Sequence, residues 1–375
     1  MFKAVAGYYK DNERLRLLVK IIAVWLISRA VMLLMVPVMN LIADEPHQWL
    51  YYMNPWDAEW YKGIVENGYQ PPKSSGMASW AFFPLYPLVC MAVRLVTMES
   101  IDTYAVGMTV SNICIIIAVY YAVKYADIEL DMKKYNKKTV EDIIIFLMLA
   151  GPFAVYYGAM YTEALFILCV ILCFYNSARH NYMAAGIAAA MASATRIVGC
   201  MLVFVLITYM FMETCAECRA KHNSEMKDNK EAGIIDKCML TEEAGILIAG
   251  NISLASVIRT FIKNVIKEPK KLVAIMISPL GIFIYMNYLR YFCGDSWAFY
   301  HVQRAWRTQK MFPVIGVLFK SCTGQLSAAS GVKTLNGIIL GWLCVITLML
   351  YAAMIRKKHY ALGIFGIIVL LIPLT

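Results

Sequence analysis

Long apolar blocks separated by shorter polar links run along the whole chain. The first block, 17-LLVKIIAVWLISRAVMLLMVPVMNLI-42, is longer than the roughly 20 residues that a helix needs to cross a bilayer. Further blocks lie at about 81–98, 104–124, 143–160, 164–178, 183–212, 272–292, 335–355 and 359–375. The pattern predicts an all-α, polytopic membrane protein with about nine transmembrane helices.

Two polar segments interrupt this pattern. Residues 40–80 contain proline, tryptophan and acidic side chains, and they begin an outer loop with interfacial helices that we place at 40–103. Residues 213–271 carry charges of nearly balanced sign, with one weak apolar patch, 245-GILIAGNISLASVI-258. We interpret the second segment as a cytoplasmic loop with one interfacial helix. No internal repeat stands out, so residues 1–375 are predicted to form a single membrane domain.

The basic residues determine the predicted sidedness. The formal net charge of +10 could indicate a nucleic-acid partner, but the Lys and Arg residues cluster beside the apolar blocks, where cytoplasmic links carry them. We therefore expect no nucleic acid, and we interpret the first block as a signal anchor with its N-terminus in the cytoplasm. The clusters comprise Lys3, Lys10, Arg14, Arg16 and Lys20 at the start and Arg356, Lys357 and Lys358 near the end.

Two topologies remain open for residues 81–98. If they cross the membrane, the lysine-rich link 124–138 falls outside, against the charge rule. If they lie in the outer interface, that link, Arg179 and residues 356–358 all fall inside, and block 183–212 divides into two short spans that meet near Arg196. The second solution is favoured, because Pro84, Pro87 and the neighbouring aromatic residues are typical of an interfacial helix.

Composition excludes a soluble protein. The chain of 375 residues is 61% apolar and 16% charged, whereas soluble domains have about 45–50% and about 25%. Most of the 11 cysteines lie inside apolar blocks, so they predict no disulfide framework. The pair in 215-CAEC-218, near His222 and Cys238, lacks a standard metal-binding spacing, and we interpret it as ordinary reduced thiols.

The first outer loop contains a dense group of aromatic and acidic residues, 54-NPWDAEWYKGIVENGY-69. A helix that starts near Pro55 would turn Trp60, Tyr61 and Ile64 toward lipid and would place Asp57 in its first turn, where a carboxylate is favoured. The simplest interpretation is an amphipathic helix on the bilayer surface. The alternative is a catalytic carboxylate at the boundary between water and lipid.

Four motifs in order resemble a known family. The run 56-WDAEWYKGIVENGY-69 followed by 81-AFFPLYPL-88 is similar to the first luminal loop of the GPI mannosyltransferase II (PIG-V) family, in the GT-C superfamily of glycosyltransferases. The run 161-YTEALF-166 resembles its Tyr-Ser-Glu-Ala-Leu-Phe, 194-ATRIVG-199 its Thr/Val-Arg-Ser-Asn-Gly, and 299-FYHVQRAW-306 a downstream aromatic-Val-Gln-x-x-Trp pattern. The resemblance implies a GT-C-like helical bundle whose outer first loop carries interfacial helices.

The resemblance also implies the chemistry. Such enzymes transfer mannose or a related hexose from a polyprenyl-phosphate carrier to a glycan or glycolipid acceptor, with inversion at the anomeric carbon. Asp57 would be the general base, because inverting transfer needs one placed carboxylate and no enzyme nucleophile. Glu59 is the weaker catalytic candidate, since two residues along a helix it points to roughly the opposite side.

Other polar residues are candidates for the donor site. Glu163 lies at the edge of block 164–178 and Arg196 lies inside block 183–212. An ionised group near the middle of a membrane costs about 2.5–3.5 kcal/mol on the lenient scale, so the two residues pair structurally or line a polar cavity. As a functional pair, Arg196 would hold the lipid phosphate and Glu163 would orient it or the acceptor. For the group in the last motif, Gln303, Arg304 and Trp306, the alternative is an aromatic belt in the membrane interface with an arginine that extends toward water. The remaining candidate donor-binding residues are Tyr161, Gln303, Arg304 and Trp306.

The expected partners are a polyprenyl-phosphate-mannose donor, the acceptor and membrane lipids. No cofactor is expected; a divalent ion shared by the carboxylates is compatible with the pattern, but no ligand spacing requires it. A eukaryotic source would place the protein in the endoplasmic reticulum and a bacterial source in the plasma membrane. The other hypotheses are a flippase or transporter of lipid-linked sugars and a non-catalytic subunit.

Two departures from the family pattern affect the acceptor side. Ile197 and Val198 replace the polar Ser-Asn pair that follows the arginine. The chain also stops at 373-PLT-375, where the family pattern leads us to expect further spans and a late Arg-Tyr motif, so we expect either a truncated C-terminus or an unusually short chain.

Overall fold

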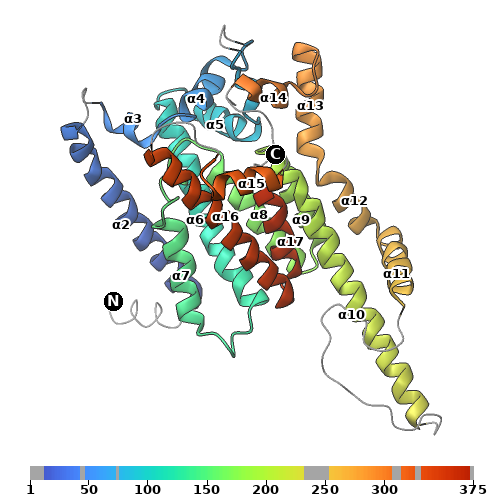
Figure 1. Ribbon diagram of the computed structural model, residues 1–375. Helices are drawn as coiled ribbons and strands as arrows, with labels where there is room; N and C mark the ends of the chain where they lie inside the picture. The colour runs from blue at the N-terminus through green and yellow to red at the C-terminus, as the bar shows by residue number, and fades with distance from the viewer. Residues whose placement is uncertain are drawn as a thin grey trace. The chain divides into compact units, whose positions relative to one another are not determined.

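The computed structural model describes residues 12–42, 47–72, 76–231, 253–305, 314–325 and 331–371, and the regular structure in these ranges is entirely helical (Figure 1). The all-α prediction is thus confirmed for this part of the chain. The chain divides into two compact units. The first comprises Met1–Ala178, Ile187–Cys200 and Ser278–Thr308, and the second comprises Arg179–Gly186, Met201–Ile277 and Gln309–Thr375.

The first unit contains most of the predicted site. Its helices are α2 (Glu13–Ile42), α3 (Trp49–Met53), α4 (Ala58–Asn67), η1 (Ser79–Ala81), α5 (Leu85–Val96), α6 (Thr103–Glu129), α7 (Lys137–Leu149), α8 (Glu163–Ala178), α13 (Leu280–Cys293), α14 (Ala298–His301) and η3 (Val302–Ala305), together with the second half of α9 (Tyr182–Ser193) and most of η2 (Ile197–Met201).

Helices α6 and α8 form the centre of this unit and pack along their lengths. Buried thiols take part, with Cys114 on α6 and Cys169 and Cys173 on α8 acting as small apolar side chains. Helices α2 and α7 pack beside α6, and Ser28 Oγ on α2 donates a 2.5 Å hydrogen bond to the carbonyl oxygen of Leu149. This scaffold positions the segment that follows α7.

Block 143–160 is not one continuous helix. Helix α7 ends at Leu149, and residues 150–162 form a series of turns before α8 begins at Glu163. The break follows from Gly151-Pro152, because proline lacks a backbone donor and its ring clashes with the preceding helical turn. The turn segment carries Tyr161 and lies beside the loop that carries Asp57.

Block 183–212 is also divided, as the favoured topology predicts. Helix α9 ends at Ser193, and the short 3₁₀ helix η2 separates it from α10 (Leu202–Glu231). Gly199 is required here because a Cβ at this position would lie 2.3 Å from the carbonyl carbon of Ala192. Arg196 therefore projects from an irregular segment between two helices.

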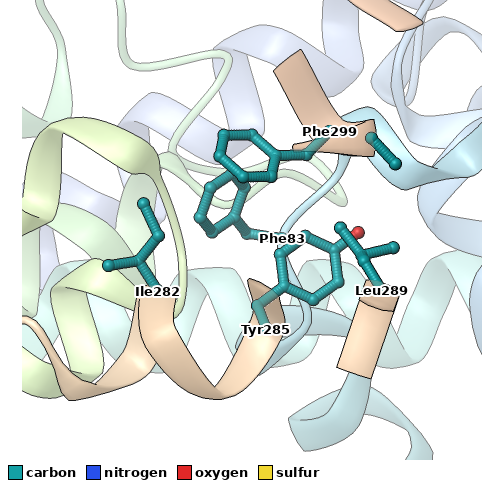
Figure 2. Packing of buried hydrophobic residues seen from close by; sticks show 6 residues of the cluster. Phe83, Ile282, Tyr285, Leu289 and Phe299 are labelled. Atoms are coloured by element: carbon teal, nitrogen blue, oxygen red, sulfur yellow. The ribbon is translucent and has the colours of Figure 1, made fainter. Parts of the chain in front are cut away.

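An aromatic cluster packs the short elements of the first unit together (Figure 2). The ring of Phe83 lies 5.2 Å from that of Tyr285 on α13 and 5.3 Å from that of Phe299 on α14. The Tyr285 hydroxyl donates to the carbonyl oxygen of Trp80 in η1 at 2.8 Å. Motifs that are about 200 residues apart along the chain are thus joined in one core.

The second unit contains the remaining helices. They are the start of α9, α10, α11 (Leu254–Lys267), α12 (Pro269–Ile277), α15 (Val314–Cys322), α16 (Gly331–Arg356) and α17 (Tyr360–Leu371). Helix α10 packs against α11, α12 and α17, and α16 packs against α15 and α17. The segment 213–231, predicted as part of a loop, continues α10 as a helix, while residues 232–252 lie outside the described ranges.

The predicted count of nine spans is not reproduced by helix length. Among the described residues, four helical segments are long and apolar enough to cross a membrane: Glu13–Ile42, Thr103–Glu129, Ile197–Ser224 and Leu335–Arg356. A fifth is added if Pro269–Ile277 and Leu280–Cys293 together form one span. Other apolar blocks form helices of 10–17 residues, among them α5, α8, α9 and α17. The chain is a helical membrane protein whose apolar blocks are partly broken.

Candidate active site

Asp57 occupies the position immediately before α4, where its carboxylate is not used for capping. It is the N-cap residue of α4, yet its side chain makes no capping hydrogen bond. The preceding Trp56 has φ of 50°, a left-handed conformation that is uncommon for a bulky residue. Both residues are exposed, and Trp56 stacks on Tyr156 with ring centroids 6.3 Å apart. An uncapped, accessible carboxylate beside a strained backbone is consistent with a functional position.

The turn segment before α8 holds the Asp57 loop by three hydrogen bonds. The backbone N–H of Met160 donates to Asn54 Oδ1 at 2.7 Å. The Tyr161 hydroxyl donates to the carbonyl oxygen of Pro55 at 2.5 Å and accepts from the backbone N–H of Asp57 at 3.1 Å. Tyr161, predicted to bind the donor, thus has its hydroxyl engaged in holding the backbone around Asp57.

Glu163 and Arg196 form an ion pair in the same unit. Arg196 Nη1, in the segment between α9 and η2, donates to Glu163 Oε1 at the first residue of α8. The second carboxylate oxygen of Glu163 is buried and has no hydrogen-bond partner. The Arg196 side chain is 43% exposed, so it remains accessible to a ligand.

Electrostatic coupling links this ion pair to Asp57. Partial burial raises the pKa of the Asp57 carboxyl group above its ordinary value, the negative charge of Glu163 raises it further, and the positive charge of Arg196 acts in the opposite direction. A raised pKa makes the carboxylate a stronger base, which is the property that general-base catalysis requires. Four predicted residues, Asp57, Tyr161, Glu163 and Arg196, are thus brought together.

The apolar face of α4 packs against protein, which corrects the expectation that it faces lipid. Tyr61 and Ile64 are 6% and 1% exposed. The Tyr61 ring contacts Phe82 and Tyr86 edge-on, with centroids 5.0 and 5.5 Å away, and Trp60 is half-buried. Periodicity identifies an apolar face, but it does not distinguish lipid from a protein neighbour.

Glu59 lies apart from this group. It is exposed, and its carboxylate accepts a hydrogen bond from the Tyr104 hydroxyl at the start of α6. Lys62 Nζ lies 4.8 Å from the centre of the same tyrosine ring. The predicted divergence of Glu59 from Asp57 is therefore found in the structure.

The downstream motif is described only in part. Phe299 belongs to the aromatic cluster, and His301 Nδ1 lies 2.7 Å from Asp295 Oδ2 at an exposed position. Gln303 is half-buried in η3, and Arg304 contributes its backbone to η3. The Arg304 side chain and Trp306 lie outside the described residues, so their predicted donor contacts remain predictions.

No metal cluster is found within the described ranges, where no group of three His, Cys, Asp or Glu side chains is close enough to hold an ion. The residues Cys215 and Cys218 are free cysteines on α10. Cys238, which the sequence places near them, falls outside the description.

Arg29 and Asn112, which were not predicted as site residues, support the turn segment that holds the Asp57 loop. Arg29 Nε on α2 donates to Asn112 Oδ1 at 2.8 Å, and Arg29 Nη1 donates to the carbonyl oxygen of Ala154 at 2.9 Å. Asn112 Nδ2 on α6 donates to the carbonyl oxygen of Gly158 at 3.1 Å. These bonds satisfy backbone groups of the turn segment that holds the Asp57 loop. The available signal was an arginine in the middle of an apolar block.

Comparison with known proteins gives one family. The family model described as mannosyltransferase (PIG-V) matches residues 13–227, a range that includes Asp57, Tyr161, Glu163 and Arg196. No curated protein and no solved structure matches the chain.

Proposed function

The chain belongs to the mannosyltransferase (PIG-V) family, and from this premise we propose how its site transfers a sugar. As a member it is a glycosyltransferase of the membrane. The proposed reaction moves mannose from a polyprenyl-phosphate carrier to a glycan or glycolipid acceptor on the outer or luminal face. The proposed location is the endoplasmic reticulum in a eukaryote and the plasma membrane in a bacterium.

Asp57 is the proposed general base. Its carboxylate takes the proton of an acceptor hydroxyl as that oxygen attacks the anomeric carbon from the face opposite the phosphate. The new glycosidic bond forms as the bond between the anomeric carbon and the phosphate oxygen breaks, and the electron pair leaves with polyprenyl phosphate. The observation that supports this role is an exposed carboxylate that makes no capping hydrogen bond to α4 and is coupled electrostatically to the Glu163–Arg196 pair.

Arg196 is the proposed phosphate ligand. Guanidinium has five N–H donors in a planar fork, and the 43% exposure of this side chain leaves it accessible while Nη1 contacts Glu163. Glu163 would orient the fork through its hydrogen bond with Nη1. Tyr161 would act through the backbone, by holding the Asp57 loop.

The test uses purified protein in liposomes with a panel of polyprenyl-phosphate sugars. Asp57→Asn should lower kcat by about 100-fold or more, within the range of general-base contributions, while donor binding persists. The matched control is Glu66→Gln on the same helix, whose exposed carboxylate accepts from Thr103 Oγ1 at 2.6 Å and should tolerate an amide.

The same panel distinguishes the competing hypotheses. Normal turnover by Asp57→Asn would reject the base assignment. Absence of transfer from every donor by the unmodified protein would favour a non-catalytic subunit, and movement of intact lipid-linked sugar across the bilayer would favour a flippase. Comparison of Glu59→Gln with Asp57→Asn distinguishes the roles of the two carboxylates. The Glu59 carboxylate accepts a hydrogen bond from Tyr104, so Glu59→Gln should lower kcat by less than about tenfold.

A further inference from the structure

Helix α11 packs on α10 with only part of its surface. Val257 and Val265 are buried, and Phe261 packs on Phe211 with ring centroids 5.7 Å apart. Asn264 Nδ2 donates to Glu217 Oε2 at 2.9 Å. Both helices belong to the second unit, in which α11 runs beside α10 (Figure 1).

A second apolar stripe on α11 is exposed. Its four members follow one another at intervals of four residues, so they lie on successive turns of one side of the helix. Their exposed fractions are 55%, 43%, 50% and 65% for Leu254, Ile258, Ile262 and Ile266. A contiguous exposed apolar stripe of large side chains is typical of an interaction surface.

A basic edge borders this stripe. Arg259, Lys263 and Lys267 each follow one member of the stripe by one residue, which places them about 100° further around the helix. The sequence of α11, LASVIRTFIKNVIK, contains no acidic residue. Apolar and cationic edges side by side are the arrangement of a helix that lies in a membrane interface.

The position at which α11 packs along α10 is consistent with a helix in the membrane interface. The continuous apolar run of α10 ends at Met212, and the next residue, Glu213, accepts from the Tyr182 hydroxyl at 2.8 Å. Lys271 Nζ lies 3.0 Å from Glu213 Oε2 and 2.8 Å from Oε1 of Glu268, the residue that follows α11. Helix α11 therefore contacts α10 near the level at which α10 changes from apolar to polar.

We propose that α11 is a docking surface for anionic lipid in the leaflet on the predicted cytoplasmic side. The stripe Leu254, Ile258, Ile262 and Ile266 inserts at the boundary of the acyl chains. The basic edge, Arg259, Lys263 and Lys267, binds the lipid phosphates, to which its charge is complementary. This surface is independent of the glycosyl-transfer chemistry.

Hydrogen–deuterium exchange of the full chain in nanodiscs tests the proposal. The discs contain phosphatidylcholine alone or a mixture with phosphatidylglycerol. Peptides from α11 should exchange at least about fivefold more slowly in the anionic discs, the factor that corresponds to one basic residue at an anionic surface. The triple variant Arg259→Gln, Lys263→Gln, Lys267→Gln should lose this dependence on lipid charge.

A charge-matched variant controls for net charge and folding. Lys133→Gln, Lys134→Gln, Lys138→Gln removes the same charge from the link before α7 and the first turn of α7, and it should keep the lipid dependence at α11. Unchanged exchange of α6 and α8 peptides verifies that each variant is folded. Equal exchange of unmodified α11 in both discs would overturn the proposal. So would protection that follows protein concentration instead of lipid charge, because a second copy would then cover the stripe.

Discussion

Asp57 combines three properties at the residue scale: it is accessible, it does not cap its helix, and it is electrostatically coupled to two other charged residues. Partial burial and the charge of Glu163 raise the pKa of its carboxyl group, while the charge of Arg196 lowers it. Asp57 must be deprotonated to accept a proton. The enzyme's activity should therefore be lost as the pH falls through the raised pKa of Asp57.

The first prediction concerns this acidic limb. In proteoliposomes, kcat/KM should fall on acidification with a midpoint above 3.8, the ordinary aspartate value. Glu163→Gln should move the midpoint to lower pH, because it removes a negative charge that raises the pKa and leaves the opposing charge of Arg196. A midpoint that stays fixed or rises in Glu163→Gln would contradict the coupling.

A second prediction at this scale distinguishes two roles of Arg196, binding of the donor phosphate and structural pairing with Glu163. Arg196→Lys keeps the charge but loses the planar fork, so the KM for the donor should rise by about tenfold or more, while the thermal unfolding midpoint changes little. The control is Arg94→Lys, whose partner Glu99 lies at the surface 3.4 Å away. An unchanged KM together with a lowered midpoint would leave only the structural pair.

At the scale of elements, the turn segment between α7 and α8 connects the buried scaffold to the catalytic loop. Arg29 and Asn112 hold its carbonyl groups from one side, and Tyr161 holds the Asp57 loop from the other. Gly158 permits this arrangement, since a Cβ there would lie 2.9 Å from Arg29 Cζ.

Gly158→Ala should therefore displace Arg29 and disturb the Asp57 loop. We expect kcat to fall by about tenfold with a smaller change in donor KM, because misplacement of a reacting group by about 1 Å costs up to about 100-fold. Gly63→Ala is the matched control: it lies in α4, where a Cβ would meet nothing within 4 Å, and should keep activity or stabilise slightly. Full activity in Gly158→Ala would show that the segment tolerates the shift.

The same scale shows what periodicity could predict. It predicted an amphipathic helix after Pro55, and the charge rule favoured a break near Arg196; both are present, as α4 and as the interruption between α9 and α10. It could not show that Tyr61 and Ile64 face protein, since lipid and a protein core are equally apolar solvents for a side chain. The early end of α7 was signalled by Gly151-Pro152, whose effect on the chain is local.

At the scale of the whole molecule, the prediction to test is the membrane topology, in which residues 81–98 lie in the outer interface. Helix α5 has 12 residues, about 18 Å at 1.5 Å per residue, against about 30 Å for the hydrocarbon core. Helix α9 has the same length, so the placement of residues 81–98 in the outer interface stays a prediction.

A membrane-impermeant thiol reagent added from outside should therefore label a cysteine at position 67, in place of Asn67, and not one at position 134, in place of Lys134. Both variants are made in a background whose reactive native cysteines are replaced. Labelling after permeabilisation is the control for access at position 134. Efficient labelling at position 134 in sealed membranes would reverse the topology and make 81–98 a span.

The sequence by itself determined the class of molecule, its helical composition and its membership of a mannosyltransferase family, whose model matches residues 13–227. These follow from local properties, such as apolar block length, charge beside the blocks and short ordered runs of side chains. Only the tertiary structure decided that Tyr161 binds the Asp57 loop, that Glu163 pairs with Arg196 and that Arg29 supports them from α2. Such contacts join residues up to 125 positions apart, and no local pattern encodes which distant partner will be adjacent.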